Sequence, residues 1–493
     1  MTASEQLAQF AAGSKALPKL CREYKKESAT VHLKELVGGA LSFYAAAAVA
    51  KTGGVHIFVA EDRDAAAYLL NDFYNLLDEK QVYFFPSSYK RSAAYGAEDA
   101  QGVVQRTAAM NAVRGFTKGY LVVCTYPEAL AERVVDAATL QRDTIAVKLG
   151  DKISIAVLED ALADANFTRV DFVYEPGQYS VRGGIVDVFS YSESKPYRID
   201  FFGDEVDSIR RFNISSQLSA DKLDRVEIVP NLNAGEAPRV SFVQFAGSGA
   251  TCWFYDVDYV LRRVNDLRRK VLADMEEPGR IDGLLTSRNV LLRDMAGNSV
   301  VALRDNLPER PATVAVVFDT APQPKFNKNF EMLADDMIRN SLRGYATYIL
   351  SENKVQVERL ENIFHQIGRG QAAVRSLSVT LHEGFVDNDL KLCLYTDHQI
   401  FDRYQRYRIN GEIRRDEQMT VAELNQLRPG DYVVHIDHGV GRFDGLVKIA
   451  AGDGRMQEAI KLVYKDGDVL FATSAWLADY ILERFPAEGP ASA

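Results

Sequence analysis

The chain has 493 residues, of which 47% are hydrophobic and 26% are charged, and its formal net charge at pH 7 is -10. This composition is ordinary for folded domains and excludes extensive disorder, while the length predicts about three or four domains. The acidic balance excludes a surface coated with nucleic-acid-binding charge, since duplex affinity comes mainly from Lys and Arg. No run reaches the roughly 18 apolar residues of a membrane span, so we expect a cytoplasmic protein.

Residues 29–135 alternate between apolar runs typical of buried strands and runs with helical periodicity. Strands that alternate with helices of this length predict a parallel α/β sheet, because parallel strands need a crossover connection. The expected strands are "TVHLKELV", "GVHIFVAE", "QVYFFPS" and "YLVVCTY", and the expected helices are "LSFYAAAAVA", "RDAAAYLLNDFYNLL" and "QGVVQRTAAMNAVRG".

Residues 146–228 have a different pattern, with short β-like runs broken by Gly, Pro and Ser. The runs include "FTRVDFVYE", "GGIVDVFS", "PYRIDFFG" and "VDSIRRFN". This pattern predicts a small antiparallel α+β domain inserted into the first one. The first domain then consists of residues 1–145 and 229–330.

The rest of the chain predicts two further domains. Residues 331–412 contain the strand "YATYILS", the helix "KVQVERLENIFHQI" and the strand "KLCLYTD", which indicate a small α/β domain. Residues 420–493 are rich in β-like runs separated by Gly-containing turns, which favours a small β-barrel. The overall fold class is therefore multidomain α/β.

The residues that nucleotide or metal chemistry requires are missing from the expected places. A phosphate-binding loop would follow the first strand, where Gly38 and Gly39 stand, but the chain contains no Gly-Lys dipeptide and therefore no Walker A motif. A tight strand-to-helix turn is the simpler interpretation. The four cysteines form no CxxC pair, and His435, Asp437 and His438 are too few convergent ligands for zinc, so we expect no metal.

Two basic stretches leave nucleic-acid contact open. In "LRRVNDLRRK" five cations spread around a helix, for which a solvated face is the simpler interpretation. "RYQRYRINGEIRR" places Tyr404 and Tyr407 among arginines, a composition compatible with base stacking but also with a packed connector.

Two long motifs resemble one known family. "YEPGQYSVRGGIVDVFSYSESKPYRIDFFGDEVDSIRRFN" closely resembles the UvrA-binding domain shared by UvrB and transcription-repair coupling factors. "RPGDYVVHIDHGVGRFDGL" and "AIKLVYKDGDVLFATSAWL" resemble the RNA-polymerase-interacting module that coupling factors share with CarD-type regulators. UvrB lacks that module, so the order of the two motifs resembles the N-terminal portion of a coupling factor.

The resemblance implies three UvrA-contacting residues, Arg182, Arg198 and Phe202. Arg and aromatic residues are common interface hot spots, because they combine large contact area with directional bonding. The alternative is that both arginines form intradomain ion pairs, for which the candidate carboxylates are Glu175, Asp200 and Asp204.

For the C-terminal domain, the resemblance implies docking to the β subunit of RNA polymerase through an exposed strand, "GLVKIAA". The expected contact residues are Leu446, Val447, Lys448 and Ile449, although Val447 and Ile449 could equally face the domain core.

The expected function is that of a monomeric, non-catalytic adaptor between RNA polymerase and UvrA in transcription-coupled nucleotide excision repair. In the family, ATP and Mg²⁺ serve a DNA-translocating motor that follows these domains, so we expect a fragment with no cofactor, and DNA contact mainly through that motor. The rival functions are a UvrB-like ATP-dependent helicase and a CarD-like transcription regulator.

Overall fold

The structure is a computed structural model, and it separates into two compact units, Met1–Arg406 and Tyr407–Ala493. In the first unit it describes residues 2–89, 99–214, 218–233, 237–275, 278–308, 310–312 and 314–403. In the second it describes residues 408–409, 412–413, 429–435, 439–450, 456–464, 469–473 and 481–485. Tyr404, Tyr407, Asp437 and His438 lie outside the described residues.

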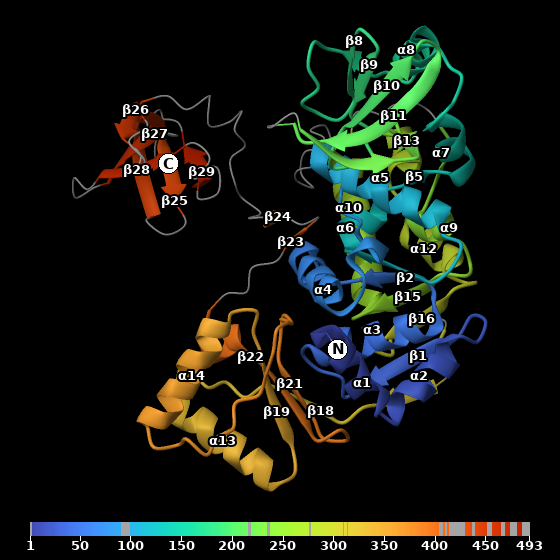
Figure 1. Cartoon of the computed structure of the whole chain (residues 1–493). Coiled ribbons are helices and arrows are strands. Elements are labelled where there is room, and N and C mark those ends of the chain that lie inside the picture. Colours follow the sequence, from blue (N-terminus) through green and yellow to red (C-terminus); the bar gives the residue numbers. More distant parts are fainter. Residues whose placement is uncertain are drawn as a thin grey trace. The chain divides into compact units, whose positions relative to one another are not determined.

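A seven-stranded sheet with the order β17-β1-β16-β15-β2-β4-β3 forms the centre of the first unit (Figure 1). Every pair of neighbouring strands in it is parallel, which confirms the predicted α/β architecture. Its strands are largely buried, as expected for a parallel sheet covered on both faces. The strands are β1 (Thr30–Lys34), β2 (Gly54–Val59), β3 (Val82–Phe84), β4 (Tyr120–Thr125), β15 (Thr251–Phe254), β16 (Ser299–Ala302) and β17 (Val314–Val317).

Two groups of helices pack around this sheet. The first group makes mutual contacts and comprises α1 (Ala3–Ala12), α2 (Ala16–Tyr24), α3 (Ala40–Thr52) and α4 (Arg63–Leu76). In the second group α6 (Pro127–Ala131) and α12 (Arg288–Asp294) contact α10 (Val257–Asp274), and α5 (Ala100–Gly115) covers β3 and β4. Right-handed crossovers place α3 and α4 on the face opposite α5, because the strand order reverses after β3.

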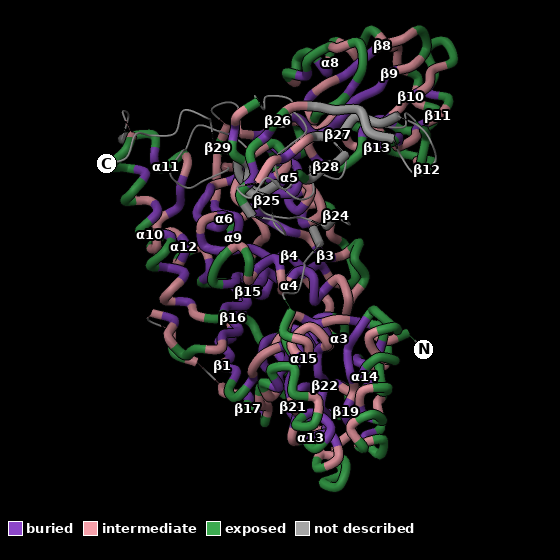
Figure 2. The backbone as a smooth tube through the Cα atoms, turned by 90° about the vertical axis from the view of Figure 1, so that its left-hand side faces the viewer, coloured by how far each residue is buried: buried purple, intermediate pink, exposed green. Residues whose placement is uncertain are grey.

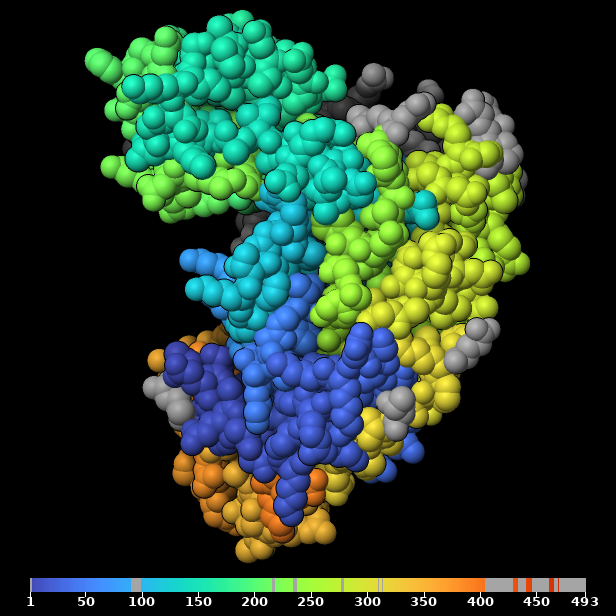
Figure 3. Space-filling view, turned by 90° about the vertical axis from the view of Figure 1, so that its right-hand side faces the viewer, coloured from blue at the N-terminus to red at the C-terminus, as the bar shows by residue number. Residues whose placement is uncertain are grey.

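A six-stranded sheet with the order β12-β11-β10-β9-β8-β7 is inserted into the first unit, where it forms the teal and green lobe of Figure 3. All its pairs are antiparallel except β7 with β8. The chain enters through β6 (Ile145–Lys148) and leaves through β13 (Arg225–Ile228), which pair with each other. The sheet comprises β7 (Thr168–Arg169), β8 (Gln178–Arg182), β9 (Ile185–Val188), β10 (Tyr197–Phe202), β11 (Glu205–Phe212) and β12 (Ser219–Leu223), and α8 (Ile155–Asp164) belongs to the same lobe.

A third, five-stranded sheet has the order β18-β21-β22-β19-β20. The passage from the first sheet to this one lies between β17 and β18, ahead of the expected boundary at residue 331. Leu333, Leu360 and Tyr395 belong to its own apolar core. Its elements are β18 (Thr320–Pro322), α13 (Phe330–Leu342), β19 (Ala346–Leu350), α14 (Lys354–Gln366), β20 (Ser376–Leu377), β21 (Phe385–Asp387), β22 (Leu392–Thr396) and α15 (Asp397–Ile400).

The second unit contains a five-stranded antiparallel sheet with the order β28-β27-β26-β25-β29. The β-rich pattern of this region is therefore confirmed, whereas closure into a barrel stays a prediction, because the described pairings run from β28 to β29 without joining them. The strands are β25 (Tyr432–His435), β26 (Gly439–Ala450), β27 (Met456–Val463), β28 (Val469–Thr473) and β29 (Ile481–Phe485).

All four cysteines are buried and unpaired, as their spacing predicts. Among the described residues, no helix is both long enough and apolar enough to cross a membrane.

Candidate functional site: an arginine and aromatic face on the inserted sheet

The inserted sheet has one apolar face and one polar face because side chains alternate along each strand. Val186 and Val188 of β9 and Ile199 of β10 belong to the lobe's core cluster. The intervening Asp187 pairs across the strands with Arg198 of β10, so both side chains lie on the opposite face. Figure 2 shows that exposed residues gather at the loops and strand ends of this sheet.

Asp187 joins the two predicted arginines on this polar face. Arg198 donates from Nε to Asp187 Oδ1 over 2.7 Å and from a terminal nitrogen to Oδ2 over 2.9 Å. Arg182, at the end of β8, donates to Oδ2 over 2.5 Å. The carboxylate is 2% exposed, whereas the Arg198 and Arg182 side chains are 15% and 35% exposed. The hydrogen bonds to Asp187 raise the pKa of the Arg198 guanidinium.

The sequence did not identify Asp187 as the partner of these arginines. The carboxylates expected for the alternative were Glu175, Asp200 and Asp204, and Asp200 instead accepts hydrogen bonds from Arg210 and Ser208. The available signal was a single acidic residue between two valines in the middle of a strand. Its orientation relative to Arg198 follows only from the register between β9 and β10.

Aromatic rings flank this pair of arginines. Phe202 ends β10 and is 84% exposed, while its neighbour Phe201 packs against the lobe's core. The two rings point to opposite faces because they are successive residues of one strand, and the register with β11 shifts between Asp200 and Phe201. The Arg182 guanidinium lies 4.8 Å from the centre of the Phe172 ring, and that of Arg198 lies 4.4 Å from the buried Phe212 ring. The face therefore presents partly exposed cations beside an exposed ring.

The basic helix α10 contrasts with this face. Arg262 pairs with Asp258 over 3.0 Å, and Arg263 pairs with Glu128 of α6 over 2.5 Å. Arg268 and Arg269 have carboxylate partners as well. This pairing favours a solvated helix face over a phosphate-binding one.

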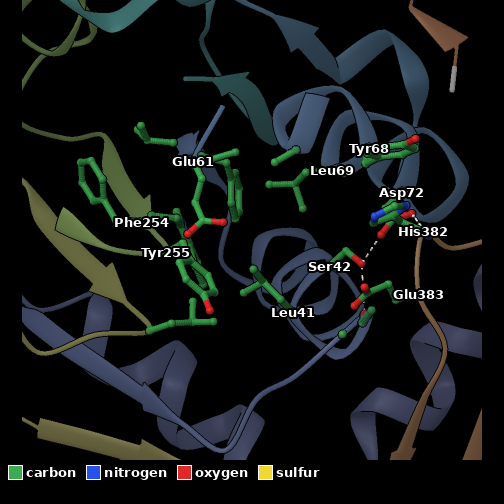
Figure 4. Close-up of a pocket in the computed structure, with 18 residues that line it drawn as sticks. Leu41, Ser42, Glu61, Tyr68, Leu69, Asp72, Phe254, Tyr255, His382 and Glu383 are labelled. Carbon is green, nitrogen blue, oxygen red and sulfur yellow. Dashed lines mark hydrogen bonds between the residues drawn. The ribbon is translucent and has the colours of Figure 1, made fainter. Parts of the chain in front are cut away.

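A pocket lies at the carboxyl ends of the central strands, where open α/β sheets usually bind their ligands (Figure 4). Glu61, Phe254 and Tyr255 lie on one side of it, and Ser42, Tyr68, Asp72 and His382 lie on the other. The described residues that line it include neither Lys nor Arg. They are Gly38, Gly39, Leu41, Ser42, Phe58, Val59, Ala60, Glu61, Ala65, Tyr68, Leu69, Asp72, Trp253, Phe254, Tyr255, Leu303, His382 and Glu383.

The turn that a nucleotide phosphate would approach is covered by another part of the chain. A Cβ atom built on Gly39 would lie 2.1 Å from the carbonyl oxygen of Glu383, which belongs to the segment before β21. Asn75 of α4 also donates to the carbonyl of Thr380 over 3.0 Å. Residues 380–383, which connect β20 to β21, therefore pack directly on the strand-to-helix turn at Gly38 and Gly39, as a tight structural turn would allow.

Asp72 of α4 forms hydrogen bonds to both α3 and the covering residues 380–383. Its carboxylate accepts the Ser42 hydroxyl over 2.6 Å and the His382 backbone N–H over 2.6 Å. The Tyr68 ring stacks on the His382 ring at a centroid distance of 3.7 Å. Burial raises the pKa of Asp72 to about 7, and the hydrogen bonds from Ser42 and His382 oppose that rise.

The expected polymerase-binding residues lie in β26 of the second unit. Leu446, Val447, Lys448 and Ile449 pair with residues 457–460 of β27. On its other side β26 pairs with β25 only through residues 439–442, so within the described pairings residues 446–449 have a partner strand on one side alone. The structure does not describe the side chains of these four residues, and their role stays a prediction.

Two segments of the chain match known domain families. Residues 145–233 match the UvrB interaction domain, and residues 427–475 match the CarD-like/TRCF RID domain. These ranges include all the interface residues expected from the sequence.

Curated proteins provide longer matches at low identity. The transcription-repair-coupling factor of Staphylococcus haemolyticus is 23% identical in an alignment that covers 82% of this chain and 41% of the relative. That of Bacillus subtilis is 22% identical in an alignment that covers 89% of this chain and 44% of the relative. The chain thus spans about two fifths of the length of the curated relatives it matches. It is related to the transcription-repair-coupling factors, and it carries a UvrB interaction domain and a CarD-like/TRCF RID domain.

Proposed function

We propose that this chain acts as an adaptor, which binds UvrA through its inserted sheet and the β subunit of RNA polymerase through its C-terminal sheet. The observation that carries the proposal is the presence of both matched domains in one chain. The proposed role is to bring UvrA to stalled RNA polymerase in transcription-coupled nucleotide excision repair.

The polar face of the inserted sheet has the composition of a protein-binding hot spot. Exposed Phe202 offers an apolar anchor, and Arg182 and Arg198 are held in fixed orientations by a buried carboxylate. Side chains that are already ordered lose less conformational freedom on binding, which favours affinity. A complementary acidic surface on UvrA would also contact cations whose positions are set in advance.

The adaptor has no motor activity in this proposal. The turn at Gly39 is covered by Glu383, and the pocket beside it is lined by carboxylates and aromatic rings without a described cation. Such a surface repels nucleotide phosphates, which bind to free helix N-termini and to lysine or arginine. We therefore propose that the chain needs no ATP, Mg²⁺ or other cofactor, unlike a UvrB-like helicase.

For the polymerase, we propose that residues 446–449 accept an added strand. Their second edge has no partner in the described pairings, and free edge N–H and C=O groups bind extended segments of other proteins. Because this mode uses backbone groups, low sequence identity with the relatives does not weaken it.

The first test is calorimetric titration of the chain into UvrA. We expect binding by the native chain, and a loss of about 30-fold or more for Phe202→Ala, as for other hot-spot residues. Phe202 is suited to this test because its exposed ring contributes little to folding. Arg198→Glu is harder to interpret, since it would place a second carboxylate against the buried Asp187.

Val157→Ala is the matched control for this titration. Val157 belongs to α8 of the same lobe and is 56% exposed, so its truncation removes a similar kind of surface away from the arginines. Equal weakening by both substitutions, or no binding by a folded native chain, would contradict the proposed UvrA interface.

The second test is co-purification of the chain with the polymerase β subunit. Ile449→Glu is expected to abolish binding, whereas Val469→Glu on β28 is expected to leave it unchanged, since Val469 is exposed and lies two strands away. Retained polymerase binding in a native chain that fails to bind UvrA would instead favour a CarD-like regulator.

A further inference from the structure

A segment of the inserted lobe, residues 170–175, is attached to the polar face of the sheet. Ser180 of β8 donates its hydroxyl to the carbonyl of Asp171 over 3.0 Å. The backbone N–H groups of Tyr174 and Glu175 donate to the Gln178 side chain over 2.8 Å and 3.1 Å. These bonds fix the segment on both sides of Phe172 and hold its ring beside β8.

The Phe172 ring is not part of the lobe's core. The core cluster lies on the other face of the sheet, and Phe172 is 49% exposed. Its ring packs on the Arg182 guanidinium, which also donates a hydrogen bond to the Asp187 carboxylate. Arg182 therefore lies between a buried carboxylate and a half-exposed ring, with about a third of its side chain in contact with water.

We propose that Phe172 is a further UvrA-contacting residue, which forms a second aromatic anchor beside Arg182. This inference rests on the proposed function, because it names an additional contact of the same face. A half-exposed ring in a fixed position offers apolar area at low entropic cost, and aromatic residues next to arginine are typical of interface centres.

Phe172 and Phe202 lie close enough together for one partner to contact both rings. The turn between β8 and β9 meets the end of β10, where the Phe201 N–H donates to the Gly184 carbonyl over 2.8 Å. Phe202 thus lies two strands away from Arg182, and two strand spacings correspond to about 10 Å. A standard interface buries about 800 Å² on each partner, which is wide enough to cover Phe172, Arg182 and Phe202 together.

A purely structural role for Phe172 predicts a different outcome. In that case the ring only holds Arg182 in place, and removing it would weaken UvrA binding only through the loss of that arginine's orientation. Replacing Arg182 separates the two roles. If Phe172 contacts UvrA directly, its truncation weakens binding further in an Arg182→Ala background, whereas a ring that acts only through Arg182 has no further effect there.

The experiment is calorimetric titration of UvrA with the full chain carrying Phe172→Ala, Phe172→Tyr, Arg182→Ala or the double substitution. We expect Phe172→Ala to weaken binding about tenfold, with Phe172→Tyr close to native and Val157→Ala unchanged. We also expect Phe172→Ala to weaken binding about tenfold again in the Arg182→Ala chain.

Two results would overturn the inference, and they differ from each other. Native affinity in Phe172→Ala, while Phe202→Ala is impaired, would contradict Phe172 alone and leave the proposed function intact. The same would follow if Phe172→Ala had no effect in the Arg182→Ala chain. Failure of the folded native chain to bind UvrA would overturn the proposed function and this inference together.

Discussion

The pocket at the carboxyl ends of the central sheet and the polar face of the inserted sheet differ in what covers them. In the pocket, the connection between β20 and β21 packs against the Gly38–Gly39 turn, and the Asp72 carboxylate accepts a hydrogen bond from the backbone of His382. On the inserted sheet, Asp187 pairs with Arg182 and Arg198, while Phe202 is largely exposed and Phe172 is half exposed. One buried carboxylate thus joins parts of the same chain, whereas the other orders side chains that remain accessible to a partner.

Replacing Asp187 tests whether this carboxylate orders the arginines of the polar face, and its expected effect is large. Asp187→Ala leaves two guanidiniums without their acceptor, so we expect a loss of about 2–4 kcal/mol in the free energy of unfolding. UvrA affinity, measured at a temperature where the variant stays folded, is expected to fall as well, because Arg182 and Arg198 lose their fixed orientation.

Asp221→Ala is the control for that substitution. Asp221 is largely exposed and lies 3.9 Å from Arg211 in the same lobe, so its removal is expected to change stability by less than about 0.5 kcal/mol. Native UvrA affinity in a folded Asp187→Ala variant would show that the arginines need no positioning.

Gly39→Ala tests whether the connection between β20 and β21 covers the turn at Gly38 and Gly39. Its backbone is in the right-handed helical region, so alanine adds only a Cβ, which would meet the Glu383 carbonyl. We expect a loss of about 1–3 kcal/mol in urea denaturation, typical of an overpacked site, with UvrA binding unchanged. Gly115→Ala at the end of α5 meets no atom within 4 Å and is expected to cost nothing; equal stability of both variants would contradict the observed packing.

The buried Asp72 carboxyl is expected to make the free energy of unfolding depend on pH. The pKa of Asp72 is about 7 in the folded protein against an ordinary value of 3.8, so the folded state holds the proton more tightly between these values. Its contribution to stability is complete below about pH 3.8 and is lost as the pH rises to about 7.

Asp72→Asn is expected to remove this slope, because the amide cannot ionise and can still accept from the His382 N–H. The free energy of unfolding of the native chain, relative to that of the variant, should therefore fall between about pH 4 and about pH 8. A constant difference over that range would mean that the carboxylate stays ionised in the folded protein.

The sequence by itself determined most of the secondary structure. The runs "GVHIFVAE" and "YLVVCTY" form β2 and β4, and "RDAAAYLLNDFYNLL" forms α4, because hydrophobic periodicity and turn residues are local signals. The absence of a Gly-Lys dipeptide and the two long family motifs could also be read directly. They indicated the relationship to the coupling factors before any contact was known.

Only the tertiary structure decided which side chains meet. The pairing of Asp187 with Arg182 and Arg198 depends on strand register, and the stacking of Phe172 on Arg182 depends on how residues 170–175 fold across the sheet. The cover over Gly39 comes from Glu383, more than three hundred residues further along the chain. Such contacts leave no periodic signal, because they arise from packing between elements rather than from the conformational preference of either one.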